Sequence, residues 1–166
     1  MLGSGILIFV TVGAMLPFDR LIQLMDNWTE QHREQDVLAQ IGKGDYIPSH
    51  MRWTRMLAPG EFREAVRACA IVVAHAGMGS FFVSMEMRRP IVILPRYASR
   101  NEVTTDHQLH TVEWLRNRPG VYVAASDDEI AGAIDVALSR GKVEIDNFSR
   151  FAPESFSKKI RRFLLQ

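Results

Sequence analysis

The chain has 166 residues, and its 20 lysines and arginines nearly balance its 19 aspartates and glutamates, for a formal net charge of +1. This length suits one domain with a substantial core, or one half of a two-domain enzyme, and the near-neutral charge argues against general nucleic-acid binding. Cys69 is the only cysteine, which excludes an internal disulfide and is compatible with a reducing cytoplasm.

The first eighteen residues carry no charge, but glycines and Pro17 interrupt them and no basic segment precedes them. This argues against a signal peptide. We expect instead a buried strand over residues 6–12, a glycine turn, and then a helix with apolar residues at helical spacing from Leu21 to Trp28. The turn, with Thr11 and Gly13, is one candidate ligand loop.

The rest of the chain alternates between short apolar runs and amphipathic segments. Further strands are expected at 37–41, 52–57, 71–74, 91–94 and 121–124, and helices at 59–68, 81–87, 109–115 and 127–138. We expect Phe82, Val83 and Met85 to face the core and Ser126 to cap the last of these helices. The alternation predicts an α/β fold: a Rossmann-like open parallel sheet with helices on both faces and ligands at the carboxyl ends of its strands.

The apolar run 71–74 stops at Gly77, Gly79 and Ser80, just before a helix. The first N–H groups of a helix lack intrahelical partners and lie at the positive end of its dipole, so they favour an anion. Glycines would let the backbone approach a phosphate, and Ser80 would add a hydroxyl. The alternative is a turn that needs glycine only for its backbone conformation.

Other chemistries lack their patterns in this sequence. The third glycine of a dinucleotide fingerprint is replaced by Phe82, and no metal-binding pattern or hydrolase elbow is present. The remaining groups suit a nucleotide sugar whose pyrophosphate lies on the turn, while residues 106–108 bond the hexose. Fixed N–H donors could stabilise the departing diphosphate without a metal. His75 is either the catalytic base or a structural histidine.

Several ordered segments resemble the glycosyltransferase family 28 C-terminal domain. They are residues 9–13, 18–22, 40–44, 75–80 and 106–108. Within that family, the sequence resembles the small catalytic subunits of two-component enzymes. These include the bacterial exopolysaccharide and capsule type and the eukaryotic subunit that adds the second N-acetylglucosamine to dolichol diphosphate sugars. Pro95-Arg96, with Glu102 and Asp106-His107-Gln108, resembles the bacterial branch.

The resemblance implies the C-terminal, donor-binding half of a GT-B fold, with a UDP-sugar donor. We expect no metal or other cofactor. Residues 77–80, including Met78, match the diphosphate loop, and Arg96, Glu102 and residues 106–108 match the sugar-contacting region. Val83 stands where many relatives carry a ribose-binding glutamate, and Glu86, one turn later, is a possible substitute. Arg96 could favour an acidic sugar such as glucuronate, or could be structural.

The resemblance also implies partners. The acceptor half would be a separate membrane-associated subunit in a heterodimer, and the acceptor a polyprenyl diphosphate-linked saccharide. We expect a cytoplasmic enzyme, peripheral at the inner face of the membrane through its partner or its C-terminal helix. One alternative is a non-catalytic nucleotide-sugar-binding or scaffold module. Another is a free-standing epimerase-type enzyme, which the length disfavours.

The tail differs from the rest, so we divide the chain into a nucleotide-sugar-binding domain at 1–145 and a C-terminal tail at 146–166. In the tail, apolar residues recur at i, i+4, i+7 and i+8 from Phe156 to Leu164, opposite lysines and arginines. This predicts a short basic amphipathic helix. It would either pack on its own domain or dock to a partner subunit or an anionic membrane surface.

Overall fold

The computed structural model describes residues 7–142 and 154–165. Within these ranges six parallel strands form one sheet in the order β3-β2-β1-β4-β5-β6. Their bounds are β1 Leu7–Thr11, β2 Asp36–Gln40, β3 Arg52–Thr54, β4 Ile71–His75, β5 Ile91–Leu94 and β6 Val121–Val123. The predicted α/β sheet is confirmed, although the expected strand 52–57 is only three residues long. Residue 6 and the predicted domain boundary at 145/146 lie outside the described residues.

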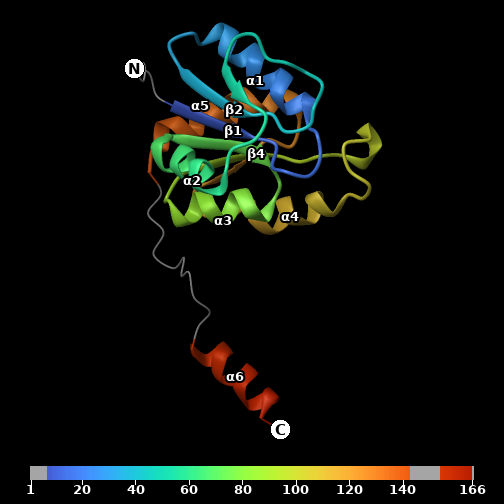
Figure 1. Ribbon diagram of the computed structural model, residues 1–166, viewed down its shortest axis with the longest axis vertical. Helices are drawn as coiled ribbons and strands as arrows, with labels where there is room; N and C mark the ends of the chain where they lie inside the picture. The colour runs from blue at the N-terminus through green and yellow to red at the C-terminus, as the bar shows by residue number, and fades with distance from the viewer. Residues whose placement is uncertain (1–6, 143–153, 166) are drawn as a thin grey trace.

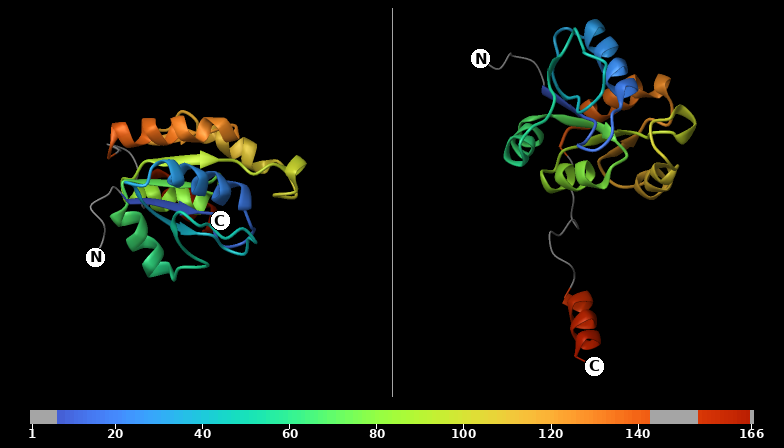
Figure 2. Two further views of the ribbon diagram at one scale, coloured as in Figure 1. Left: turned by 90° about the horizontal axis from the view of Figure 1, so that it is seen from above. Right: turned by 45° about the vertical axis from the view of Figure 1, so that its right-hand side comes forward.

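Helices cover both faces of the sheet (Figure 1). α1 (Asp19–Gln31) and α5 (Ile130–Arg140) pack on one face, and α2 (Pro59–Ala68), α3 (Met78–Glu86) and α4 (His107–Leu115) pack on the other. The left view of Figure 2 shows the sheet between α5 and α2. β1, β4 and β5 are buried on both faces, as their unbroken apolar runs predict for central parallel strands.

Neighbouring side chains of β1 show how the two cores form. Ile8 and Val10 belong to the core beneath α1 and α5, whereas Phe9 points to the opposite face and meets Phe62 of α2 edge-on, with ring centroids 5.3 Å apart. This alternation follows from the two-residue period of a strand.

Two local predictions are wrong. Phe82, expected in the core, is 47% exposed, and Phe81 of α3 is buried in its place. The other two residues expected there fit the prediction, because Met85 is buried and Val83 packs partly buried against the core. Ser126 makes no side-chain cap; a short 3₁₀ turn, Asp127–Glu129, precedes α5, and the carboxylate of Glu129 accepts the N–H of Ala125 at 2.8 Å instead.

The connection from β2 to β3 contains no helix in the described structure, and a buried carboxylate organises it instead. Asp26 of α1 accepts hydrogen bonds from the N–H groups of Ser49 and His50 and from the hydroxyl of Tyr46. Burial alone would raise the pKa of Asp26, but these hydrogen bonds outweigh it and hold the pKa below its ordinary value. Asp26 therefore fastens this loop to α1.

The C-terminal helix α6 (Glu154–Leu164) is the predicted amphipathic segment, and none of its described residues is buried. Among the described helices, none combines the length and apolar character needed to cross a membrane.

Candidate functional site

A pocket of about 390 Å³ opens at the carboxyl edge of the sheet, beside β1 and β4. The chain order reverses between these two strands, and open α/β sheets bind ligands at such switch points. Gly13 and Ala14 form one wall, and Gly79, Ser80 and Val83 of α3 form another. The remaining lining residues are Gln40, Met56, Leu57, Pro59, Phe62 and Arg63.

The N-terminus of α3 supplies the polar character of this pocket. Gly77 is its N-cap in an extended conformation, and the first helical backbone bond runs from the N–H of Phe81 to the carbonyl of Gly77, at 3.2 Å. The N–H groups of Met78, Gly79 and Ser80 precede that bond, so they have no partner within the helix. With the helix dipole they favour an anion in the pocket, such as a phosphate.

Glycine is required at different positions of this region for different structural reasons. A Cβ on Gly77 would lie 2.1 Å from Nε2 of His75, and one on Gly13 would lie 2.7 Å from its Cε1. The imidazole therefore occupies the space that both glycines leave free. A Cβ on Gly79 would meet nothing within 4 Å. Of the three, Gly79 is the glycine whose bare backbone faces open space in the pocket.

His75 itself is a poor proton acceptor. Burial, together with the nearby charge of Arg96, lowers the pKa of His75 to about 4, and its buried Nδ1 has no hydrogen-bond partner within the described structure. The ring is therefore neutral near pH 7 and weakly basic. This geometry favours the structural interpretation of His75; its catalytic role stays a prediction.

The side chains of Thr11 and Gln40 hold the loop after β1, which lines the pocket. The hydroxyl of Thr11, which is fully buried, accepts the N–H of Gly13 at 3.1 Å and the amide of Gln40 at 3.3 Å. Gln40 also donates to the carbonyl of Gly13 and accepts the N–H of Leu57. Thr11 thus shapes the loop after β1. Gln40 was noted in the sequence only as part of a family segment, although a polar residue near the end of the apolar strand expected at 37–41 was a usable indication.

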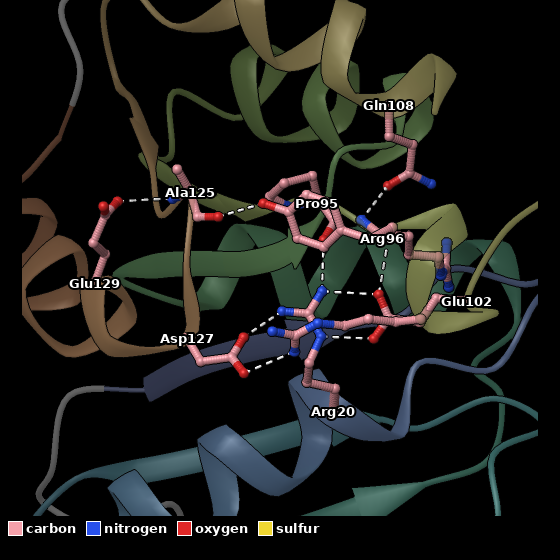
Figure 3. Close-up of polar contacts among 10 residues, drawn as sticks. Arg20, Pro95, Arg96, Glu102, Gln108, Ala125, Asp127 and Glu129 are labelled. Carbon is pink, nitrogen blue, oxygen red and sulfur yellow. Dashed lines mark hydrogen bonds and ion pairs between the residues drawn. The ribbon is translucent and has the colours of Figure 1, made fainter. Parts of the chain in front are cut away.

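A second cluster, centred on Arg20 of α1, joins this helix to the β5–α4 and β6–α5 connections at the same edge (Figure 3). Arg20 donates from Nε to one oxygen of Glu102 at 2.6 Å and from Nη2 to the other at 2.9 Å. It also donates to Asp127 at 2.5 Å and to the carbonyl of Pro95 at 2.7 Å. Burial would lower the pKa of Arg20, but the two carboxylates raise it above its ordinary value. Arg20 was noted in the sequence only as part of a family segment.

The residues predicted to contact a sugar differ in what they already bind. Arg96 is buried, and its guanidinium donates to the carbonyls of Val12 and Leu16, at 2.8 Å each, so it supports the loop after β1. Burial lowers the pKa of Arg96 to about 10. Its own N–H donates to the buried side chain of Gln108 at 3.0 Å.

Glu102 is held by Arg20, and the carboxylate of Asp106 accepts the N–H of Ala98 at 2.9 Å. His107 is exposed and bonds to Thr105. Within the described part of the chain, these residues, with Arg96 and Gln108, lie outside the lining of the pocket. Their sugar-binding role stays a prediction, with Asp106 and His107 the most accessible.

At the predicted ribose position the pocket is lined by Val83. Glu86 does not line it and instead pairs with Arg63 of α2 at 2.8 Å. The hydrogen bond from Arg63 to Glu86 raises the pKa of the arginine. Arg63 is a cation at the pocket wall that no sequence pattern indicated, because only the packing of α2 against α3 brings it there.

The fold places the chain in the class of open α/β domains, with a pocket at the sheet switch point beside a helix N-terminus. A family model described as the glycosyltransferase family 28 C-terminal domain matches residues 7–117. The chain therefore belongs to this family. A search of curated protein sequences gave no significant match.

Solved structures show the same fold. The NMR structure of ALG13 has a TM-score of 0.61 at 13% identity, with 93% of this chain and 94% of that chain covered. The glycotransferase of kitacinnamycin has a TM-score of 0.61 at 14% identity, and SnogD from Streptomyces nogalater has 0.52 at 16%. The chain spans only 36% and 38% of these last two proteins, although 84% and 82% of it is covered.

Proposed function

We propose that this chain is the donor-binding subunit of a UDP-sugar-dependent glycosyltransferase. It would transfer a hexose or glucuronate to a polyprenyl diphosphate-linked saccharide in exopolysaccharide or capsule synthesis. The observation that carries this proposal is the pocket in which Gly79 and Ser80, at the start of α3, face Gly13 and Ala14 across the sheet switch point. Membership of a glycosyltransferase family supports it.

The chemistry of the pocket suits a nucleoside diphosphate. A phosphate at the start of α3 would accept hydrogen bonds from the free N–H groups of its first turn, while the apolar side chains of Met56, Leu57 and Val83 would surround the nucleoside. The same N–H groups would stabilise the negative charge that develops on the departing UDP, and for this reason we propose transfer without a metal or other cofactor.

We place the acceptor site on a separate membrane-associated subunit. Deprotonating a sugar hydroxyl requires a stronger base than His75, whose pKa is lowered to about 4, so the partner is the better source of the catalytic base. The similarity in fold and extent to ALG13 supports a donor-binding domain that acts as its own subunit. The chain would work on the cytoplasmic side, peripheral at the membrane through its partner or its C-terminal helix.

A second candidate is a non-catalytic nucleotide-sugar-binding or scaffold module of the same fold. Val83 at the ribose position and the weak basicity of His75 favour it. Turnover of a UDP-sugar by the chain mixed with its partner would exclude this alternative.

The first test is calorimetric titration of the full chain with UDP, with ADP as the comparison nucleotide. We expect selective UDP binding. Gly79→Leu should weaken that binding by about tenfold or more, because the side chain would enter the phosphate position and block charge-assisted hydrogen bonds.

Gly132→Leu is the matched control, since a Cβ on Gly132 of α5 also meets nothing within 4 Å and Gly132 is not part of the pocket lining. UDP affinity that is equal in the wild-type chain and in Gly79→Leu would place the nucleotide elsewhere. Equal affinity for UDP and ADP would contradict a uridine donor.

A further inference from the structure

Helix α6 separates its charged and apolar side chains into two opposite faces. At 3.6 residues per turn, the four apolar residues fall within an arc of about 100°, and the four cations fall on the other side of the helix. The apolar residues are Phe156, Ile160, Phe163 and Leu164, and the cations are Lys158, Lys159, Arg161 and Arg162.

Helix α6 accounts for the net positive charge of the chain. With Glu154 as its only acid, α6 carries a net charge of +3, whereas the whole chain carries +1, so the rest of the chain is net negative, at −2. Among the described residues, Lys158 pairs with Glu154 at 3.0 Å, and the other three cations of α6 have no carboxylate partner. These charges are therefore available to an external anionic surface.

The apolar face is also available. Phe163 is 78% exposed and Leu164 74%, and Phe156 and Ile160 are about half exposed. Aromatic and aliphatic side chains grouped on one face favour removal from water. The opposite side of the helix carries the cations. A surface that contacts both sides of α6 must therefore offer hydrocarbon to the apolar face and negative charge to the cations.

A bilayer containing anionic lipids has this composition. Eleven residues correspond to about 16 Å of helix, far short of the roughly 30 Å hydrocarbon core, so α6 would lie in the plane of the interface. Its apolar face would enter the acyl boundary while its lysines and arginines remained among the headgroups.

We propose that α6 is an interfacial anchor that binds this chain reversibly to anionic lipid bilayers. The contact narrows the peripheral location proposed above to a lipid contact made by the chain itself. It does not depend on the donor pocket. A single three-turn helix gives a weak anchor, which suits a subunit that a membrane partner also holds.

The test is co-sedimentation of the full chain with vesicles of mixed phosphatidylglycerol and phosphatidylcholine, compared with phosphatidylcholine alone. We expect binding to the anionic vesicles that weakens as salt is raised, because surface potentials are screened. The variant Lys158→Gln/Lys159→Gln/Arg161→Gln/Arg162→Gln keeps the apolar face and good helix formers. Each cation near an anionic surface is worth about fivefold in membrane affinity, so removing all four should lower the partition coefficient by several hundredfold.

The matched control is Arg33→Gln/Arg116→Gln/Arg140→Gln/Lys142→Gln, which removes the same charge from exposed positions of the folded domain. It should bind nearly as well as the unchanged chain. Ile160→Ser/Phe163→Ser keeps every cation and should also lose binding, since membrane insertion needs both faces.

Equal binding to phosphatidylcholine alone, or full binding by the variant that lacks the α6 cations, would overturn the proposal. So would self-association in the absence of lipid that Ile160→Ser/Phe163→Ser abolishes, because it would assign the apolar face to a protein contact. UDP titration of the same variants separates this result from the proposed transferase, since loss of the anchor should leave nucleotide affinity unchanged.

Discussion

Replacing Gly77 by alanine tests whether the ring of His75 is what requires a glycine there. The added Cβ would lie 2.1 Å from Nε2, 2.7 Å from Cε1 and 2.9 Å from Cδ2 of His75, so the ring would have to move. Overpacking of this kind costs about 1–3 kcal/mol. The backbone adds no penalty because φ is −104°, and alanine would return roughly 0.4–1 kcal/mol by restricting the unfolded chain. We expect a net loss of about 1–2 kcal/mol.

The assay is urea unfolding of Gly77→Ala, His75→Ala and the double variant. With the ring removed, Gly77→Ala should be neutral or slightly stabilising, which gives a coupling free energy of about 1–3 kcal/mol between the two sites. Gly79→Ala is the open-space control and should stabilise the chain by up to about 1 kcal/mol. Gly13→Ala should stay destabilising even without His75, because its φ of +77° strains any other residue.

A Gly77→Ala penalty of the same size with and without His75 would refute this reasoning. The glycine would then be required by the backbone or by the pocket, and not by the imidazole.

Two further predictions concern charge. The pKa of His75 is lowered to about 4 from the usual 6.5, so the unfolded chain binds a proton more readily than the folded chain between these pH values. The free energy of unfolding should therefore be unaffected above pH 6.5 and should fall as the pH drops toward 4, by at most about 3 kcal/mol. Urea unfolding across this range should show a shallower pH slope for His75→Asn, and an unchanged slope would contradict the buried ring. Arg20→Met should cost about 3 kcal/mol, because it leaves Glu102 and Asp127 without their shared partner. The control is Arg100→Gln, which removes a more exposed ion pair to the same Asp127 and should cost less than about 1 kcal/mol. Equal unfolding midpoints for Arg20→Met and Arg100→Gln would argue against a central role for Arg20.

The sequence predicted the elements of this fold better than their arrangement. β4 and β5 are unbroken apolar runs that need no tertiary information to recognise, and both were placed within one residue. The order of the strands was not predictable in the same way, because it depends on which faces pack together. The burial of Phe81 in place of Phe82 was missed for a related reason: the two residues are equally apolar, and the side of α3 that packs on the sheet decides which one is buried.

The site shows the same division. Gly79 and Ser80 line the pocket and could be selected from a local pattern, a strand followed by a glycine turn. Gln40 and Arg63 reach the pocket from other strands and helices, and Arg20 meets Glu102 and Asp127 across 82 and 107 residues of sequence. Contacts at such separations leave no periodicity or spacing to detect.

The short edge strand β3 affects the dynamics of the pocket. β3 is three residues long, pairs with β2 alone in the described sheet, and is reached through the loop that Asp26 holds. Elements with few bonded neighbours open locally at a small fraction of the global unfolding free energy. Met56 and Leu57, which directly follow β3, belong to the pocket wall. One side of the pocket therefore lies next to an edge strand that opens more readily than the central strands of the sheet, and a bound ligand would stabilise the closed form of that edge by mass action.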